Sequence, residues 1–383
     1  MNGEWKTVEL REVATIERSV IQPTDIVSGT RYLGLEHIES GGRILGATPV
    51  GEGELASSKF NFNEKHVLYG KLRPYLTKIS CPNFAGICST DILPILPGPK
   101  LDRRFLCYFL RQPLMVNYAN SRAVGINLPR LAPSILGRFQ IPLPPLAEQR
   151  RIADILDRAE ALRAKRRAAL AQLDSLTLSI FLDLFGHPVS NQKRWPLTPF
   201  SEVGTLERGI SKHRPRNAPE LLGGPYPLVQ TGDVANCDGY IRNYHCTYSE
   251  IGLRQSRIWS AGTLCITIAA NIAKTGILTF DACFPDSIVG FNAVESATVE
   301  YIRYWLSFLQ KSLEDAAPES TQKNINLALL RGLLVPVPPL ELQREFATQV
   351  AAVEKLKTTQ RASLEELDNL FASLQYRAFR GEL

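Results

Sequence analysis

Two long stretches of the chain share the same pattern of hydrophobic and polar positions. Residues 152–184 and 346–378 carry apolar side chains at alternating spacings of three and four, which is typical of a coiled-coil helix. A proline-rich segment precedes each stretch, PLPPLAEQR at 142–150 and PVPPLELQR at 336–344. Because Pro-x-Pro-Pro favours extended backbone and cannot continue a helix, each helix is predicted to begin just after its prolines.

These two segments belong to an internal repeat. With an offset of 194 positions, residues 141–185 and 335–379 are identical at about 17 of 45 positions. A weaker match precedes each copy, EVATIERSV at 12–20 and EVGTLERGI at 202–210. The chain is therefore predicted to be a duplicated unit, in the order globule, helix, globule, helix.

Both apolar seams are interrupted at the same register. Arg163 and Arg166 occupy the seam of the first helix, and Lys357 and Gln360 occupy that of the second. A polar break near the middle of each helix favours antiparallel pairing in a molecule with pseudo-twofold symmetry. The alternative, in which each helix packs only on its own globule, explains neither the duplication nor the shared break.

The segments outside the helices have mixed periodicity. Stretches such as HVLYGKLRPYLTKIS and GTLCITIAANIAKTGILTF are rich in β-forming residues broken by Gly and Pro, whereas RRFLCYFLRQPL and EYIRYWLSFLQKSL read as amphipathic helices. The predicted fold class is α+β, with two pseudo-twofold-related globular domains separated by two long antiparallel coiled-coil helices. The predicted boundaries are 1–140 and 186–334 for the globular domains, and 141–185 and 335–383 for the helices.

The composition is that of an ordinary soluble protein, with 44% hydrophobic and 21% charged residues among 383. No apolar run approaches the roughly 18 to 20 residues that span a bilayer, and the N-terminus lacks the apolar core of a signal peptide. We therefore expect a cytoplasmic protein with reduced cysteines. The seven cysteines include no CxxC pair, and the spacings Cys81/Cys88 and Cys237/His245/Cys246 favour ordinary thiols over zinc ligands.

Motifs for catalysis are missing from the sequence. The Pro-Pro pairs lack the preceding polar residue and following aromatic residue of an amino-methyltransferase loop, and no GxxxxGK[ST] phosphate loop occurs. Pro285-Asp286 begins a metal-nuclease pattern, but Glu295 is followed by Ser and Ala without a lysine. The sequence therefore predicts that this chain is not an enzyme and holds no metal or cofactor.

The protein is mildly basic and has local clusters of residues of the types that bind DNA. The formal charge is +6, and residues 1–140 carry 17 Lys and Arg against 12 Asp and Glu. Arg, Lys, Asn and Gln read base edges, and Lys and Arg neutralise phosphates. A solvated charged surface would look the same for any one residue, but each globule has such a cluster. The candidate DNA-binding residues are Lys71, Arg73, Tyr75, Lys78, Arg208, Lys212, Arg214, Arg216, Asn271, Lys274, Thr321, Gln322 and Lys323.

Together these features resemble the DNA specificity subunit of type I restriction–modification systems. The resemblance rests on the two repeated helix starts, PLPPLAEQRRIADIL and PVPPLELQREF. The segments VLYGKLRPYLTKI and NINL are also similar to segments of the family's recognition domains. The resemblance covers nearly the whole chain. One departure is Leu342, which stands where the first copy has Glu148 and puts a polar contact at the second helix start in doubt.

The resemblance implies two target recognition domains, each reading half of an asymmetric, interrupted DNA sequence, with the helices as a spacer. It also implies two methyltransferase subunits docked on the helices, and restriction subunits that complete an endonuclease. S-adenosylmethionine, ATP and Mg²⁺ would then belong to those partners. The helix residues assigned to spacing and docking are Gln149, Arg150, Leu170, Leu173, Gln343, Arg344, Leu364 and Leu367.

Two other functions stay open from the sequence. One is a single-chain restriction or modification enzyme with unrecognised catalytic motifs, which incubation with DNA, S-adenosylmethionine and Mg²⁺ would reveal. The other is a coiled-coil scaffold without a DNA role, which salt-dependent DNA binding by the assembled complex would exclude.

Overall fold

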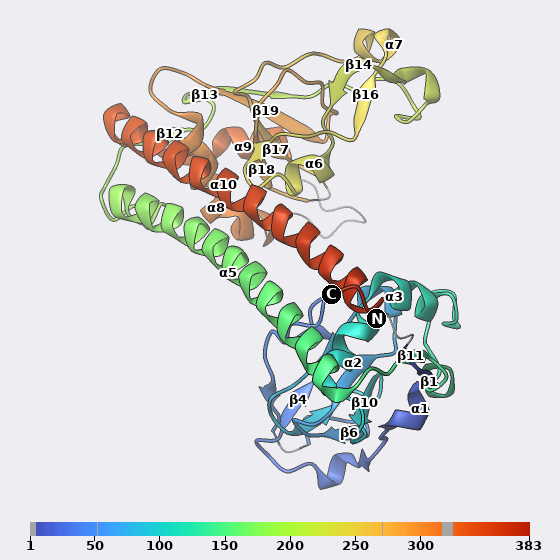
Figure 1. The fold of residues 1–383 in the computed structure, drawn as a ribbon. Helices are drawn as coiled ribbons and strands as arrows, with labels where there is room; N and C mark the ends of the chain where they lie inside the picture. The colour runs from blue at the N-terminus through green and yellow to red at the C-terminus, as the bar shows by residue number, and fades with distance from the viewer. Residues whose placement is uncertain (1–4, 52, 270, 316–324) are drawn as a thin grey trace. The chain divides into compact units, whose positions relative to one another are not determined.

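The computed structural model describes residues 5–51, 53–269, 271–315 and 325–383 (Figure 1). The chain forms two compact units. The first contains Met1–Arg167 and Ala362–Leu383, and the second contains Ala168–Arg361. Each unit therefore combines one globular domain, the first half of the long helix that follows it, and the second half of the other long helix.

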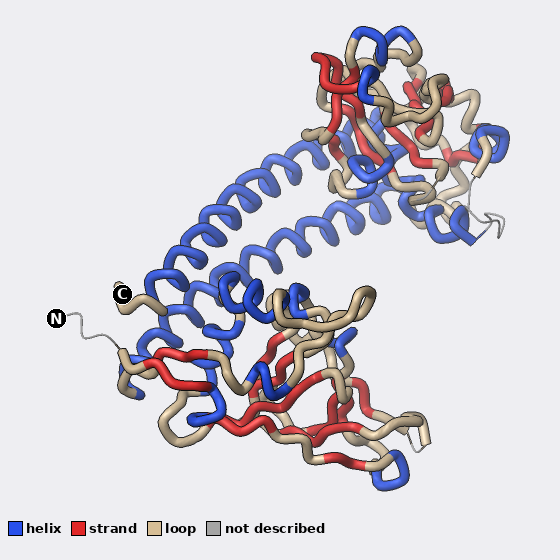
Figure 2. The backbone as a smooth tube through the Cα atoms, turned by 90° about the vertical axis from the view of Figure 1, so that its right-hand side faces the viewer, coloured by secondary structure: helices blue, strands red, loops and turns tan. Residues whose placement is uncertain are grey.

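The two long helices begin where the prolines predict. Helix α5 spans Leu146–Phe185 and helix α10 spans Leu340–Ala378, so each starts directly after its Pro-Pro pair (Figure 2). Before each helix, the extended backbone that proline favours forms a short strand. These strands pair antiparallel with the N-terminal strand of the same domain: β11 (Gln140–Pro142) with β1 (Thr7–Glu9), and β20 (Leu334–Pro336) with β12 (Leu197–Pro199).

The first unit contains two further sheets. The four-stranded sheet has the order β2 (Ala14–Ile16), β10 (Ile92–Pro97), β7 (Val67–Gly70) and β8 (Ile79–Ser80). The five-stranded sheet has the order β3 (Val20–Ile21), β6 (Lys59–Phe62), β9 (Gly86–Cys88), β4 (Arg31–Leu33) and β5 (Thr48–Pro49). Its helices are α1 (Leu10–Val13), η1 (Pro23–Asp25), η2 (Leu35–His37), η3 (Pro74–Leu76), α2 (Arg103–Leu110), α3 (Pro113–Asn120) and α4 (Pro133–Leu136).

The second unit also has two further sheets, but they differ in size from those of the first unit. Its five-stranded sheet has the order β13 (Gly204–Arg208), β19 (Ile288–Ala293), β17 (Leu264–Thr267), β18 (Thr275–Leu278) and β15 (Tyr240–Ile241), and a separate pair joins β14 (Leu222–Leu228) to β16 (Cys246–Tyr248). Its helices are η4 (Pro219–Leu221), α6 (Thr231–Ala235), α7 (Glu250–Arg254), α8 (Val299–Asp315) and α9 (Leu327–Gly332).

The hydrophobic core of each unit includes side chains from the C-terminal half of the long helix that begins in the other unit. In the first unit, Phe371 and Leu374 of α10 pack against the core that contains Phe105 of α2. In the second unit, Phe181 and Phe185 of α5 are fully enclosed in the core. Within each unit, the first half of one helix therefore runs beside the last half of the other, and the directions are antiparallel.

The predicted α+β class, the duplication and the pairing of the long helices are confirmed. The predicted helix over RRFLCYFLRQPL is shorter than expected, because α2 ends at Leu110 and Pro113 begins a new helix, α3.

The expectation about membrane spans needs a correction. An 18-residue window of α5 has a mean hydropathy of 1.4 and is long and apolar enough to cross a bilayer, although only 17% of it is buried. Its charged residue Asp174 pairs with Lys357, and Phe181 belongs to the core, so this helix is part of the folded unit. Its exposed part includes the apolar side chains of Leu176, Leu178 and Leu182.

Candidate nucleic-acid interface

The first basic stretch, residues 71–78, forms a tight turn around η3. Arg73 has a left-handed backbone, with φ of 51°, directly before this 3-10 helix. Its backbone N–H donates to the Pro129 carbonyl at 2.7 Å, and its guanidinium donates to the Asn127 carbonyl at 3.3 Å. The turn is therefore held against the loop that follows α3.

The predicted side chains of this turn differ in their partners. Tyr75 is half exposed. The ammonium of Lys71 lies 3.8 Å from the carboxylate of Asp91. The Lys78 ammonium donates to the Leu35 carbonyl at 2.6 Å, so the domain itself engages this charge. Of the four predicted residues, Lys71, Arg73 and Tyr75 are better placed than Lys78 to meet a partner.

In the second unit, the predicted arginines lie around Asp286. Arg216 forms an ion pair with Asp286, and the Arg214 guanidinium lies 3.5 Å from the same carboxylate. Arg208 donates to the backbone carbonyl of Asp286 at 3.0 Å. The three arginines and the neighbouring Lys212 are exposed. Two arginines share one carboxylate, and Arg208 and Lys212 add exposed positive charge nearby in the sequence, which suits phosphate binding.

The predicted amide and lysine residues lie apart from this arginine cluster. Asn271 is exposed, and its carbonyl accepts a hydrogen bond from the Thr267 hydroxyl. The Lys274 ammonium lies 3.5 Å from the Gln310 side chain. Thr321, Gln322 and Lys323 lie outside the described residues.

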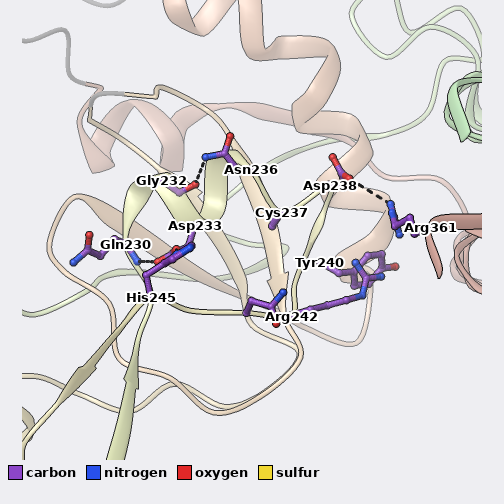
Figure 3. A pocket seen from close by; sticks show the side chains of 11 residues that line it. Gln230, Gly232, Asp233, Asn236, Cys237, Asp238, Tyr240, Arg242, His245 and Arg361 are labelled. Atoms are coloured by element: carbon purple, nitrogen blue, oxygen red, sulfur yellow. Dashed lines mark hydrogen bonds and ion pairs between the residues drawn. The ribbon is translucent and has the colours of Figure 1, made fainter. Parts of the chain in front are cut away.

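A polar cavity of about 510 Å³ lies beside α6 in the second unit (Figure 3). Its polar groups form separate pairs. His245 is 2.6 Å from the Asp233 carboxylate, and Arg361 is 3.5 Å from Asp238. In the described parts of the chain, no group of three or more His, Cys, Asp or Glu side chains could hold a metal ion. The cavity thus offers paired side chains without a converging set of ligands or nucleophiles.

The polar breaks of the two helices form matched ion-pair centres. In the first unit, the Arg163 guanidinium contacts Glu160 and Asp368, each at 2.5 Å, and lies 4.4 Å from the Phe371 ring centre. Because Asp368 belongs to α10 and the other two charges belong to α5, this centre joins the helices within the unit.

The second unit contains the same centre at equivalent positions. The Lys357 ammonium contacts Asp174 at 2.6 Å and Glu354 at 3.0 Å, and its side chain is only 4% exposed. Adding 194 to 160, 163 and 174 gives 354, 357 and 368, so each centre is the image of the other in the repeat. The shared break in the apolar seam is therefore a cross-helix ion pair that occurs once in each unit.

The pKa values in the second centre follow from its charges. Burial alone would lower the pKa of Lys357, but its hydrogen bonds to Asp174 and Glu354 outweigh burial and raise it. Burial alone would raise the pKa of Glu354, but Lys357, Arg361 and Arg242 together outweigh burial and lower it. Both groups are therefore held in their charged forms near neutral pH.

The glutamines of the two repeats, Gln149 and Gln343, are fully buried. The Gln149 amide donates to Lys100 O at 3.0 Å and Pro144 O at 2.8 Å, and its oxygen accepts from the N–H of Asp102 at 2.7 Å. These bonds join the proline segment to the start of α2.

Gln343 makes the equivalent bonds in the second unit. Its amide donates to Ser296 O at 3.1 Å and Pro338 O at 2.9 Å, and its oxygen accepts from the N–H of Thr298 at 2.9 Å. Both glutamines therefore act inside their own unit, and neither side chain is accessible to a docking partner.

The other predicted helix residues are more accessible. Arg150 and Arg344 are exposed, whereas the leucines at the shared positions are partly buried: Leu170, Leu173, Leu364 and Leu367. The most exposed leucines of the long helices are others, and they also repeat with an offset of 194. Leu162 and Leu370 in the first unit are 50% and 49% exposed, and Leu356 and Leu176 in the second are 53% and 46% exposed.

Comparison with known families identifies the repeat. Residues 2–172 and 193–368 each match the model of the type I restriction modification DNA specificity domain. The chain belongs to the type I restriction–modification DNA specificity family. Two copies of this domain in one chain confirm the resemblance seen in the sequence, and the family is one of DNA-recognition subunits without catalytic activity.

Curated relatives agree with this assignment. The EcoDI specificity subunit of Escherichia coli is 30% identical over half of this chain, a match that spans 44% of the relative. The EcoKI specificity subunit of Escherichia coli K12 is 24% identical over 79% of this chain and 69% of the relative. The first of these matches thus covers less than half of the relative's own length.

Solved structures share the fold of this specificity-family chain. The S subunit of a type I restriction–modification system from M. genitalium aligns over 99% of this chain and 96% of its own, with a TM-score of 0.59 and 14% identity. A chain from a study of complex assembly and conformational transition in a type I system aligns over 99% and 98%, with a TM-score of 0.55 and 23% identity.

Some features of the site were not predicted from the sequence. The identity of Glu160 with Glu354 and of Asp174 with Asp368 was visible, but spacing alone does not show which charges meet. The buried role of Gln149 and Gln343 was also missed, because a polar residue beside prolines at a helix start reads as exposed. The signal that could have found both is the retention of these residues in two otherwise diverged halves.

Proposed function

We propose that this chain is the DNA-sequence-specificity subunit of a type I restriction–modification complex, in which each globular domain reads one half of a bipartite target. The observation that carries the proposal is the match of both halves of the chain to the specificity domain. A separate basic surface in each unit supports it: the turn with Lys71 and Arg73 in the first, and the arginines around Asp286 in the second.

The proposal assigns partner docking to the helices. Single exposed leucines are common, but exposed apolar side chains that lie together mark surfaces that other proteins cover. Equivalent leucine pairs, Leu162 with Leu370 and Leu356 with Leu176, occur once in each unit. An apolar groove of about 420 Å³ in the second unit includes Leu176 and Leu356. Two equivalent surfaces fit two copies of one methyltransferase subunit.

The remaining chemistry is assigned to the partners. S-adenosylmethionine would bind to the methyltransferase subunits, and ATP and Mg²⁺ to restriction subunits, within a complex that acts on DNA in the cytoplasm. The chain itself would supply sequence readout and spacing.

Co-expression with the methyltransferase subunit of the same system, followed by sequencing of methylated adenines, tests the proposal. We expect methylation at one interrupted, asymmetric motif, and none with either protein alone. Methylation by the purified chain alone would instead support a single-chain enzyme. A methyltransferase whose motif is unchanged without this chain would support a scaffold.

The assignment of the basic surfaces has its own test. Replacing Arg214 and Arg216 together by Gln should weaken DNA binding by the complex. The plot of log K against log salt should also become less steep, by about one unit of slope for each phosphate that is no longer neutralised. Arg254→Gln, an exposed arginine on α7 of the same domain, is the matched control. Equal salt slopes in all three proteins would identify the cluster as a solvated surface.

A further inference from the structure

The loop after α3, residues 121–131, displays apolar side chains instead of burying them. Val124 is 77% exposed, Ile126 is 101% exposed and Leu128 is 46% exposed. Isolated exposed leucines are common, but three alternate aliphatic residues on one loop form a surface that water solvates poorly.

The loop is held in this shape by its own backbone. Val124 and Arg130 exchange two backbone hydrogen bonds of 3.0 and 2.9 Å, which form a single antiparallel bridge that closes the loop. Gly125 has φ of +121°, and a Cβ at this position would lie 2.9 Å from the Leu128 carbonyl. The Leu131 N–H also donates to Lys71 O at 2.9 Å, so the loop is fixed to the basic turn.

Positive charges surround the apolar tip. Arg73 donates to Asn127 O within the loop, and Arg130 is bound to Asp91 through two nitrogens at 3.0 and 3.3 Å. Arg122 lies over the Tyr118 ring at 3.4 Å from its centre. Lys71 lies 3.8 Å from the same Asp91 carboxylate, so Arg73 contacts the tip while Arg130 and Lys71 share one carboxylate near its base. A complementary surface must therefore be apolar at its base and anionic at its sides.

We infer that this loop enters the major groove of the first DNA half-site and that Ile126 contacts the 5-methyl group of a thymine. The inference rests on the proposed function and names a specificity-determining residue within it. A loop closed by a single antiparallel bridge can enter the major groove, which is about 12 Å wide and admits an element as broad as an α-helix. The thymine methyl is the apolar group on base edges there, and the phosphates at the sides match the arginines.

The test uses the complete methyltransferase complex and a duplex that carries its mapped motif. Each thymine of the first half-site is replaced in turn by uracil, which removes only the methyl group. One replacement should weaken binding of the wild-type complex about fourfold, the effect of exposing one methyl-sized group. Ile126→Ser should weaken binding to the thymine duplex and abolish the difference between thymine and uracil at that position.

Controls separate the possible outcomes. Ile126→Ser changes no charge, so the salt slope should stay the same. Ile126→Val should retain the discrimination, and Val27→Ser, at a 73% exposed position between η1 and β4, should behave as wild type. Discrimination that survives Ile126→Ser, or a wild-type complex that never distinguishes thymine from uracil in this half, would overturn the inference.

Two further outcomes would also overturn the inference. An Ile126-dependent rise in 2-aminopurine fluorescence would show a wedge between bases. Ile126-dependent binding to phosphatidylglycerol vesicles would show a membrane surface. Failure of the proposed function is distinguishable, because the wild-type complex would then bind its motif no better than a scrambled duplex.

Discussion

At the scale of single residues, the clearest feature is the charge placed within each apolar seam. Arg163 and Lys357 are positioned where a coiled coil normally has an apolar side chain, and each meets an acid of its own helix and one of the other. A buried ion pair is seldom more stable than an apolar contact, but it penalises alternative registers that would leave its charges unpaired. We therefore expect these centres to favour the observed register of the helix pair.

Lys357→Met should destabilise the second unit by about 1–3 kcal/mol, because it leaves the buried carboxylate of Glu354 without its closest partner. The remaining contacts of Glu354 with Arg242 and Arg361 limit the loss. Chemical denaturation measures the free energy of unfolding. Lys355→Met, at an exposed neighbouring position, should change it by less than about 0.5 kcal/mol. Equal effects of both variants would contradict the ion-pair account.

The same centre predicts the direction of acid sensitivity. The folded-state pKa of Glu354 lies below its usual value of 4.5, so its contribution to stability is complete above that pH. It is lost as the pH falls through the folded-state pKa. The pKa of Lys357 is raised above its usual 10.5, so its contribution is lost only at more alkaline pH. In Glu354→Gln, the melting temperature should depend less on pH below 4.5; an unchanged dependence would contradict this.

At the scale of elements, most of the fold could be predicted because proline and apolar periodicity act locally. The helices begin after Pro145 and Pro339 as predicted, and the β-rich phrases form strands. What could not be predicted depends on contacts between distant residues. Spacing does not show that Gln149 bonds to Asp102, nor that a charge in one seam meets an acid in the other.

The buried glutamines should be essential to their own domains. Gln149→Leu removes the partners of the Asp102 N–H and the Lys100 carbonyl, and each unsatisfied buried group costs about 1–3 kcal/mol. Hydrogen exchange should show faster opening at the start of α2, and Gln343→Leu should do the same at the start of α8. Arg150→Leu, at the next and exposed position, should leave exchange unchanged. Slow exchange in Gln149→Leu would show that the bonds are dispensable.

At the scale of the whole molecule, the two long helices are continuous elements that pass from one compact unit into the other. The unit boundaries fall after Arg167 in α5 and after Arg361 in α10, which are themselves 194 positions apart. If the helices act as the spacer of a bipartite DNA reader, their length at this boundary should determine the gap between the half-sites.

Inserting four residues after both Arg167 and Arg361 tests the spacer. Each insertion adds about 6 Å and roughly restores the helical face, at about 1.5 Å per residue and 3.6 residues per turn. Because B-DNA rises about 3.4 Å per base pair, the gap in the methylated motif should grow by one or two base pairs. Two-residue insertions rotate the seam by about 200° and should impair assembly. An unchanged gap with active four-residue insertions would contradict the spacer role.

The most direct test of the central claim is an exchange of one globular domain. Residues 1–140 are replaced by the corresponding domain of another specificity subunit, the chimera is expressed with its methyltransferase, and methylated adenines are mapped. Independent reading predicts that one half of the motif changes, while the other half and the gap stay the same. A folded, active chimera whose motif changes in both halves, or in neither, would contradict the account.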